Sequence, residues 1–402
     1  MNISALNENG QKVDWWFMYK VPKLSKGENN DSATGYEYVY FDNKSSEVTK
    51  SPFVINQGKG ALNQTLDAVF KSPPKTTTGW ILYNDEMPAD ADKGHDDGNL
   101  GHTKGVIAFD TASKTAYWLL HSWPKFADPK ATQDPTPMYG QTYLCVSLDI
   151  ATAGKIATQM ASHQEPQTYL CKTANLPATD PLSVLTQPLK PNPKLAGSID
   201  LKTIGGTPFK VIAKNREWND DFWNDLVGPT LGEDMDIETW IRGPIPPIAD
   251  RDGIHKTFDI KFINLGPLGA HWAWPETHDH AKWGITTHNN WVCVGDINRM
   301  ISQRKRGGGT IAFQNQILWQ ALSKTDLLLA PPGHSRVDAR AIVKTSHTDE
   351  QPAKVAKTAK AKANAKTPKP PAVAASAKSK AKPAKKTAKS GPKKTKARSG
   401  SK

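Results

Sequence analysis

The sequence lacks, or has little of, three features that would restrict where the protein works. It has no run approaching 18 uninterrupted apolar residues, which excludes a membrane-spanning helix. Its N-terminus has no basic segment followed by an apolar one, so we expect a cytoplasmic protein or one exported by a route that uses no such signal. It has only three cysteines: Cys145 and Cys171 could pair in an oxidising compartment, but so small and odd a number equally suits a reducing one.

The C-terminal segment lacks acidic and aromatic side chains altogether. Residues 351–402 contain 16 lysines and one arginine, a charge of +17, whereas the whole chain carries +13, which leaves −4 for residues 1–350. Such a segment cannot bury enough apolar surface to offset chain entropy, so we expect residues 350–402 to be disordered when free. The segment resembles the Lys/Ala/Pro tails of linker histones and bacterial histone-like proteins. We favour a DNA-binding arm over the alternative, a solubilising tail.

The first 350 residues alternate between patterns typical of strands and of helices. Apolar positions at helical spacing predict helices over residues 61–72, 151–162 and 314–324. Runs that are rich in aromatic and β-branched residues and end in turn formers predict strands. These runs are residues 13–22, 36–42, 79–85, 105–110, 115–122, 141–150, 258–266, 283–288 and 290–297.

A Pro-rich segment divides this part of the chain. Residues 174–196 have the composition of a loop, and strand and helix patterns occur on both sides of them. We therefore expect a mixed α/β protein with a first half over residues 1–173, a crossover loop, and a second half over residues 197–349.

Two stretches share the pattern His-x-Lys followed by an apolar run. GHTKGVIAFD contains His102 and Lys104, and DHAKWGITTH contains His280 and Lys282. Because positions i and i+2 of a strand point to one face, the imidazole and the ammonium of each copy project together. One copy alone would more often be two solvated side chains on a surface strand. Two copies in matching contexts instead predict a shared phosphate site, with a nitrogen nucleophile and fixed positive charge.

Over roughly residues 13–322 the sequence resembles the deoxyribonuclease II family, a branch of the phospholipase D superfamily. The matching stretches are VDWWFMYKVP, LYND, GHTKGV, HSWPKF, YGQTYLCVS, DHAKW, WVCVGDINR and RGGGT. The resemblance implies a pseudo-twofold body of two α/β halves with the active site between them. It also implies endonucleolytic cleavage of DNA at acidic pH that needs no metal or other cofactor and leaves 3′-phosphate and 5′-hydroxyl ends.

The resemblance assigns roles to individual residues. The two His-x-Lys copies take the two catalytic positions, His121 falls on a histidine that the family requires, and Asn298 falls on a phosphate-binding position of the superfamily. One histidine would attack phosphorus and form a phosphohistidine, while the other protonates the leaving 5′ oxygen and then activates water. Analogy favours His102 as the attacking residue. The Lys-rich tail is not part of the family pattern.

Other residues beside the catalytic stretches could contact DNA. Trp123 and Trp283 lie next to them and could stack on a base, although tryptophans are more often core residues. Arg304 and Arg306 belong to the stretch RKRGGGT, which could approach the DNA backbone or form a plain basic turn.

Two segments could be taken for metal sites. His278, His280 and His288 could bind a metal together, but no carboxylate or cysteine accompanies them at ligand spacing. Residues 90–98 are acidic like a calcium loop but lack its regular ligand spacing, so we expect a solvated loop. We therefore assign no metal ligands.

Three functions remain compatible with the sequence. The first, which we favour, is an acid endonuclease with DNA as its substrate. The second is a phospholipase D-type phosphodiesterase on another substrate, such as a lipid, but no apolar or membrane-facing segment supports it. The third is a non-catalytic histone-like DNA-binding protein, which the tail favours but the two intact His-x-Lys copies do not. The oligomeric state stays open.

Overall fold

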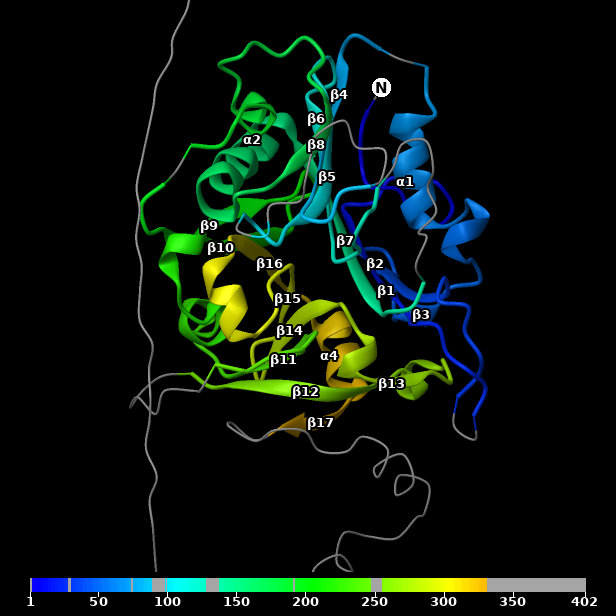
Figure 1. The fold of residues 1–402 in the computed structure, drawn as a ribbon. Helices are drawn as coiled ribbons and strands as arrows, with labels where there is room; N and C mark the ends of the chain where they lie inside the picture. The colour runs from blue at the N-terminus through cyan, green and yellow to red at the C-terminus, as the bar shows by residue number, and fades with distance from the viewer. Residues whose placement is uncertain are drawn as a thin grey trace, which may run out of the picture. The chain divides into compact units, whose positions relative to one another are not determined.

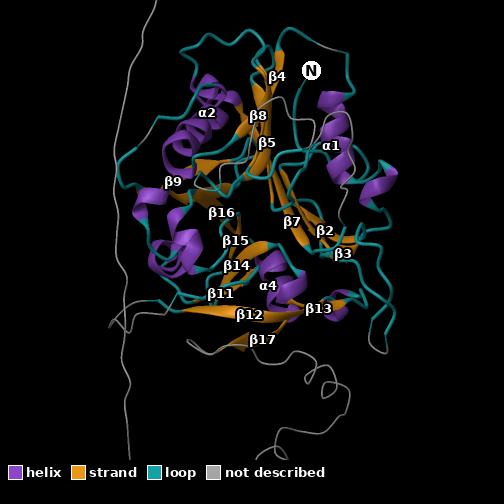
Figure 2. Cartoon of the chain, viewed as in Figure 1, coloured by secondary structure: helices purple, strands orange, loops and turns teal. Residues whose placement is uncertain are grey.

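The computed structural model describes residues 2–330, except residues 28–29, 74, 89–97, 99, 128–136, 191 and 247–254. The Lys-rich tail and most of the acidic segment at residues 90–98 lie outside the described residues. The described residues belong to one compact unit, a mixed α/β body built on two large β-sheets (Figure 1, Figure 2). This confirms the predicted α/β class.

The first sheet has eight strands in the order β3-β2-β1-β7-β6-β5-β4-β8, all paired antiparallel. Its strands are β1 (Trp15–Lys20), β2 (Tyr38–Asp42), β3 (Thr49–Lys50), β4 (Thr78–Asn84), β5 (Lys104–Asp110), β6 (Thr115–His121), β7 (Gln141–Asp149) and β8 (Thr168–Lys172). Every strand predicted before residue 173 is confirmed. The two that were missed, β3 and β8, are short strands at the edges of the sheet.

The second sheet has the order β13-β12-β11-β14-β15-β16-β10-β9, and β17 also pairs with β12. Its strands are β9 (Ala196–Lys202), β10 (Pro208–Lys214), β11 (Met235–Thr239), β12 (Thr257–Asn264), β13 (Ala273–Pro275), β14 (Lys282–Thr286), β15 (Trp291–Gly295), β16 (Gly308–Gln314) and β17 (Asp326–Ala330). Only β12, β14 and β15 were predicted. All strands of the first sheet end by Lys172 and those of the second begin at Ala196, so the chain changes sheet within the segment predicted as a crossover.

The main core lies between the two sheets. Along β1, Trp15, Phe17 and Tyr19 face this core, because alternate residues of a strand point to opposite faces. The ring of Trp15 lies 5.0 Å from that of Phe313, and the ring of Tyr19 lies 6.3 Å from that of Trp283. Aromatic contacts across the interface therefore join the sheets into a single body.

Helices pack on the outer faces of the sheets and between them. Residues of α1 pack on the outer face of the first sheet, and η5 on that of the second, whereas residues of α2 and α4 belong to the core between the sheets. The helices are α1 (Ala61–Phe70), α2 (Ile150–Gln159), α3 (Gly228–Leu231), α4 (Gln316–Thr325), the π-helical η2 (Met160–Gln164) and η5 (Phe222–Val227), and the 3-10 turns η1 (Ile55–Gln57), η3 (Pro181–Thr186), η4 (Arg216–Trp218), η6 (Gly266–Leu268), η7 (Glu276–His278) and η8 (Ile301–Lys305). The three predicted helices are confirmed as α1, α2 and α4.

Two further findings concern the cysteines and the helices. Cys145, Cys171 and Cys293 are all unpaired, so the possible Cys145–Cys171 disulfide is not formed in this structure. Among the described residues, no helix combines the length and the apolar character needed to cross a membrane.

Candidate active site

The two His-x-Lys copies occupy the same position in their sheets. His102 precedes β5, which begins at Lys104, and His280 precedes β14, which begins at Lys282. From each of these strands the antiparallel order continues alike, as β5-β6-β7-β1 in the first sheet and β14-β15-β16-β10 in the second. The last strand of each series comes earlier in the chain than the others. Each His-x-Lys pair thus lies at the start of the first strand in a series of four, and the four strands follow one another in the same order in both sheets.

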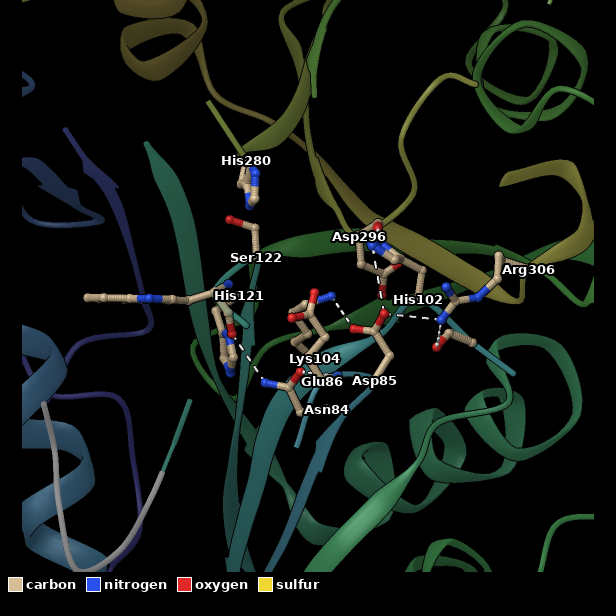
Figure 3. A network of polar contacts seen from close by, with 12 residues as sticks. Asn84, Asp85, Glu86, His102, Lys104, His121, Ser122, His280, Asp296 and Arg306 are labelled. Carbon is tan, nitrogen blue, oxygen red and sulfur yellow. Dashed lines mark hydrogen bonds and ion pairs between the residues drawn. The ribbon is translucent and has the colours of Figure 1, made fainter. Parts of the chain in front are cut away.

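The structure brings the two copies to one site. The charge of Lys104 acts on His280 and on Lys282, and the charge of Lys282 acts on His102. Figure 3 shows His102 and Asp85 clustered on one side of Lys104, with His280 on the other. Residues that lie 178 positions apart in the chain therefore face each other.

The ring of His102 is held between a carbonyl and a carboxylate. Its Nδ1 contacts the backbone oxygen of Asp296, and its Nε2 lies 3.7 Å from Oδ2 of Asp85. Burial lowers the pKa of His102 well below its ordinary value, and the Lys104 ammonium lowers it further, whereas Asp85 opposes both. The ring is therefore neutral over most of the pH range when no anion is bound.

Asp85, which the sequence did not single out, connects the cations around His102. Its carboxylate binds the ammonium of Lys104 and accepts from Nη2 of Arg306 over 3.1 Å. Burial raises the pKa of Asp85, but Lys104, His102 and Arg306 together bring it below the ordinary range. Asp85 directly follows β4, whose last residue, Asn84, pairs in register with Lys104. The signal that could have identified Asp85 is that an acidic residue ends the strand pattern next to β5.

Arg306 lies inside this network. In addition to Asp85, its guanidinium donates to the carbonyl of Leu100 over 2.5 Å and to that of Gly101 over 3.0 Å. These contacts bind the stretch RKRGGGT of the second half to the segment that carries His102. Arg304 is half-buried, and its predicted contact with DNA stays a prediction.

His280 has different surroundings. Its ring stacks on Tyr139, with centroids 3.9 Å apart and planes at 12°, and it contacts the ring of Trp240 at 4.2 Å. Burial lowers the pKa of His280 far below its ordinary value, and Lys282 and Lys104 lower it further. Among the described residues, its Nε2 has no hydrogen-bond partner. Tyr139 begins the stretch YGQTYLCVS, but nothing in the sequence placed Tyr139 or Trp240 beside His280, because both come from other segments of the chain.

Three more buried groups complete the cationic site. Burial lowers the pKa of Lys282 to about 7, with a further contribution from Lys104, and its Nζ donates to the carbonyl of His280 over 2.5 Å. Burial raises the pKa of Asp296 to about 7, although its Oδ1 accepts from the N–H of Gly309 over 2.8 Å. Asn298 is buried two residues after Asp296.

His121 is a buried neutral histidine next to Lys104. It is fully buried at the end of β6, and its Nδ1 accepts from the N–H of Trp123 over 3.2 Å, so the proton of the neutral ring lies on Nε2. Burial, with a smaller contribution from the charge of Lys104, lowers the pKa of His121 to about 3. Its ring packs 5.3 Å from Phe126 and 5.7 Å from Tyr143. This placement suits a supporting residue.

The prediction that Trp123 and Trp283 stack on a DNA base does not hold in this structure. Both side chains are fully buried. Trp123 stacks on Phe126 with ring centroids 5.5 Å apart, and Trp283 packs edge-on against Tyr19 in the core between the sheets. A base cannot reach either ring without unpacking the core, so both tryptophans support the site from within.

Within the described part of the chain, no group of three or more His, Cys, Asp or Glu side chains has the geometry to hold a metal ion. His278 and His288 are exposed, whereas His280 is directed into the cationic site. The positive charge around the two histidines comes instead from Lys104, Lys282 and Arg306 and, at His280, also from Lys20.

Comparisons with known proteins agree with the resemblance. The family model described as Deoxyribonuclease II matches residues 4–329. The chain is 65% identical over 348 residues to "Putative deoxyribonuclease-2" of Burkholderia pseudomallei, and the match covers 86% of this chain and 99% of the relative. It is 32% identical over 354 residues to "Deoxyribonuclease-2" of Caenorhabditis elegans (80% and 92% covered) and 31% identical over 334 residues to "Deoxyribonuclease-2-alpha" of Rattus norvegicus (79% and 91% covered).

Proposed function

Because this chain belongs to the deoxyribonuclease II family and is a deoxyribonuclease, we propose how it cleaves DNA. It hydrolyses internal phosphodiesters at acidic pH without a metal ion, through a phosphohistidine, and leaves 3′-phosphate and 5′-hydroxyl ends. The observation that carries this proposal is the meeting of two His-x-Lys pairs, from opposite halves of the chain, in one cationic site.

The two halves form a pseudo-twofold body of the phospholipase D type. The matching order of β5-β6-β7-β1 and β14-β15-β16-β10 supports this relation. Each half contributes one histidine and one lysine, so a scissile phosphate between the halves meets two imidazoles and two ammonium groups.

His102 is the nucleophile. A carbonyl oxygen only accepts hydrogen bonds, so the contact of Nδ1 with the carbonyl of Asp296 supports a ring that carries its proton on Nδ1. The lone pair of Nε2 is then free to attack phosphorus. Attack forms the Nε2–P bond and breaks the bond between phosphorus and the 5′ oxygen, so the phosphoryl group stays on the 3′ oxygen and on His102.

His280 is the general acid and then the general base. In the first step it gives its proton to the departing 5′ oxygen. In the second step the neutral ring takes a proton from water, the hydroxide attacks phosphorus, and the bond to His102 breaks to release the 3′-phosphate. Because burial and two lysines lower the pKa of His280, protonation before catalysis requires acidic pH, and the charge of the bound phosphate assists it.

The cations hold the non-bridging oxygens while negative charge builds up. Lys104 and Arg306 are paired with Asp85 in the structure, and Lys282 bonds a backbone carbonyl. A bound phosphate competes with Asp85 for these donors and, in a site shielded from water, receives strong stabilisation. Asn298 adds a polar contact, and His121 supports Lys104 from the side of the core.

Plasmid cleavage tests the proposal. Full-length protein is incubated with supercoiled DNA in EDTA across pH 4 to 8, and the new ends are analysed by kinase labelling before and after phosphatase treatment. We expect cleavage in EDTA that is faster near pH 5 than near pH 8 and 5′ ends that accept phosphate directly. Loss of cleavage in EDTA with recovery on adding a divalent ion, or 5′-phosphate ends, would contradict it.

The Lys-rich tail supplies most of the nonspecific affinity for DNA. Its +17 contrasts with −4 for residues 1–350. Each neutralised phosphate contributes about −0.9 to the slope of log affinity against log salt, so six engaged cations give a slope of roughly −5. Truncation after Glu350 is expected to flatten this slope while the single-turnover rate at saturating DNA stays within a few-fold. An unchanged slope would contradict the proposal that the tail is a DNA-binding arm.

A further inference from the structure

Each of the two histidines is held through its backbone by a glycine of the opposite half. The N–H of His102 donates to the carbonyl of Gly307 over 2.9 Å, and the N–H of His280 donates to the carbonyl of Gly140 over 2.9 Å. Gly307 directly precedes β16 and Gly140 directly precedes β7, the strands that occupy the same place in the two series. The same contact is therefore made twice, in opposite directions across the interface.

Neither glycine has room for a side chain. A Cβ on Gly307 would lie 2.5 Å from the carbonyl oxygen of Gln164, and a Cβ on Gly140 would lie 2.6 Å from Oδ1 of Asp279. Both distances are shorter than a carbon–oxygen contact allows, so backbone packs directly on its neighbour at each position. Because these glycines have no side chain of their own to anchor them, other groups must hold the two loops.

A buried lysine holds the loop before Gly307. Lys214, the last residue of β10, is fully buried, and its Nζ donates to the carbonyls of Gln303, Arg304 and Arg306 over 3.0, 2.7 and 2.5 Å. An ammonium group has three protons to donate, and here three carbonyls of one loop accept them. A buried ammonium group without such partners is strongly unfavourable, so the loop cannot easily move its carbonyls away.

A second buried lysine contacts the loop before Gly140. Lys20, the last residue of β1, is fully buried, and its Nζ donates to the carbonyls of Val21, Gly35 and Pro137 over 3.0, 2.7 and 3.4 Å. Of these three residues, Pro137 belongs to the loop that ends at Gly140, and the other two anchor the ammonium beside the first sheet. β1 and β10 close the two matching strand series, so Lys20 and Lys214 occupy equivalent positions.

We propose that Lys214 and Lys20 are positioning residues that act across the interface between the halves. Lys214 fixes the place of His102 through the loop that ends at Gly307, and Lys20 fixes the place of His280 through the loop that ends at Gly140. The catalytic consequence rests on the proposed function, because it requires these histidines to react with phosphate. A reacting group displaced by about 1 Å loses on the order of 10²-fold in rate.

Amide hydrogen exchange in full-length protein labelled with ¹⁵N-histidine tests the inference. Replacing Lys214 with methionine (Lys214→Met) is expected to speed exchange of the His102 amide at least about tenfold and to leave the His280 amide within about twofold. Lys20→Met is expected to do the reverse. The control is Lys210→Met, on the same strand as Lys214, where the lysine pairs with Asp200 and is partly exposed; both amides are expected to stay unchanged.

The selectivity of the response decides the outcome. Equal acceleration of both amides in either variant indicates general loosening of the fold and overturns the inference, and so does no acceleration of either. If Lys214→Met does not fold, Gly307→Ala provides the same test, with only the His102 amide expected to respond. Exchange does not depend on cleavage, so a different catalytic mechanism would leave this result intact. In the proposed mechanism, each lysine variant also loses about 10²-fold in kcat with KM within about threefold.

Discussion

His102 and His280 carry the same motif in different surroundings. The ring of His102 contacts a backbone carbonyl and faces the carboxylate of Asp85 at 3.7 Å. The ring of His280 lies instead against aromatic side chains, with Tyr139 at 3.9 Å and Trp240 at 4.2 Å. Both rings are neutral without substrate, because burial lowers both pKa values.

This difference teaches that a duplicated motif need not have duplicated roles. The carbonyl beside Nδ1 of His102 can only accept a hydrogen bond, which supports the proposed role of this ring as a nucleophile whose other nitrogen keeps its lone pair. Aromatic faces orient the His280 ring without accepting a hydrogen bond from its nitrogens. This freedom suits the proposed acid, which gives and then takes back a proton.

Substrates that differ in leaving group should separate the two histidines most strongly. On DNA, His102→Ala and His280→Ala should each lose at least about 10³-fold in rate. On a nucleoside 3′-(4-nitrophenyl phosphate), whose leaving group needs no proton, His280→Ala should retain a nitrophenolate burst within about tenfold of wild type, whereas His102→Ala should show none. Circular dichroism melting checks that both variants are folded. A burst retained by His102→Ala instead would exchange the two roles.

The pH profile should report the proposed acid, His280. Only the minor fraction of free enzyme in which this histidine is protonated reacts, because burial with Lys282 and Lys104 lowers its pKa. Above that pKa the protonated fraction falls tenfold for each pH unit, so log(kcat/KM) on DNA should fall with a slope near −1 and lose about 10²-fold from pH 5 to 7. The burst on the nitrophenyl substrate should lack this limb. An equal limb on both substrates would assign the titration to another group.

Asp85 should matter for the stability of the cationic site around His102. Asp85→Asn leaves Lys104 and Arg306 as buried cations without their carboxylate, and breaking such a pair costs about 3 to 5 kcal/mol of unfolding free energy. Inorganic phosphate should restore more stability to this variant than to wild type, because it replaces the missing anion. The control is Asp200→Asn, which breaks an ion pair with the half-exposed Lys210 and should cost at most about 1 kcal/mol. Denaturant unfolding with and without phosphate measures the stability of both variants and of wild type. If phosphate stabilises Asp85→Asn and wild type equally, it does not bind where the Asp85 carboxylate was.

The smallest predicted effect concerns His121, which belongs to neither of the two His-x-Lys pairs. Burial lowers its pKa to about 3 in the folded state, so the unfolded chain binds a proton below its ordinary pKa of about 6.5 and the folded chain does not. Its contribution to stability is therefore present above about pH 6.5 and is lost as the pH falls toward 3. His121→Asn should remove this loss, so its stability relative to wild type should improve by about 1.4 kcal/mol per pH unit from pH 6 to 4. Parallel stability curves would show that His121 is already protonated in the folded protein.

Local patterns predicted the first sheet better than the second. The runs around β1, β4 and β7 are long, aromatic and central, so their composition already indicates strands. The stretch RKRGGGT suggests a contact with the DNA backbone or a basic turn and gives no sign of a strand, yet β16 begins at Gly308. A Cβ on Gly309 would lie 2.8 Å from the carbonyl of Ile212, so close packing on β10 favours glycine there. The neighbouring strand β10, and not the local sequence, explains why glycine occupies position 309.

The sequence by itself determined that two His-x-Lys pairs begin strands in matching contexts, because strand periodicity and motif spacing are local properties. Only the tertiary structure decided what surrounds each histidine. The carbonyl that contacts His102 comes from Asp296, 194 positions away, and the ring that stacks on His280 comes from Tyr139. Such partners leave no periodic trace, since they meet only when the two sheets pack together. Packing therefore turned two similar motifs into two different environments.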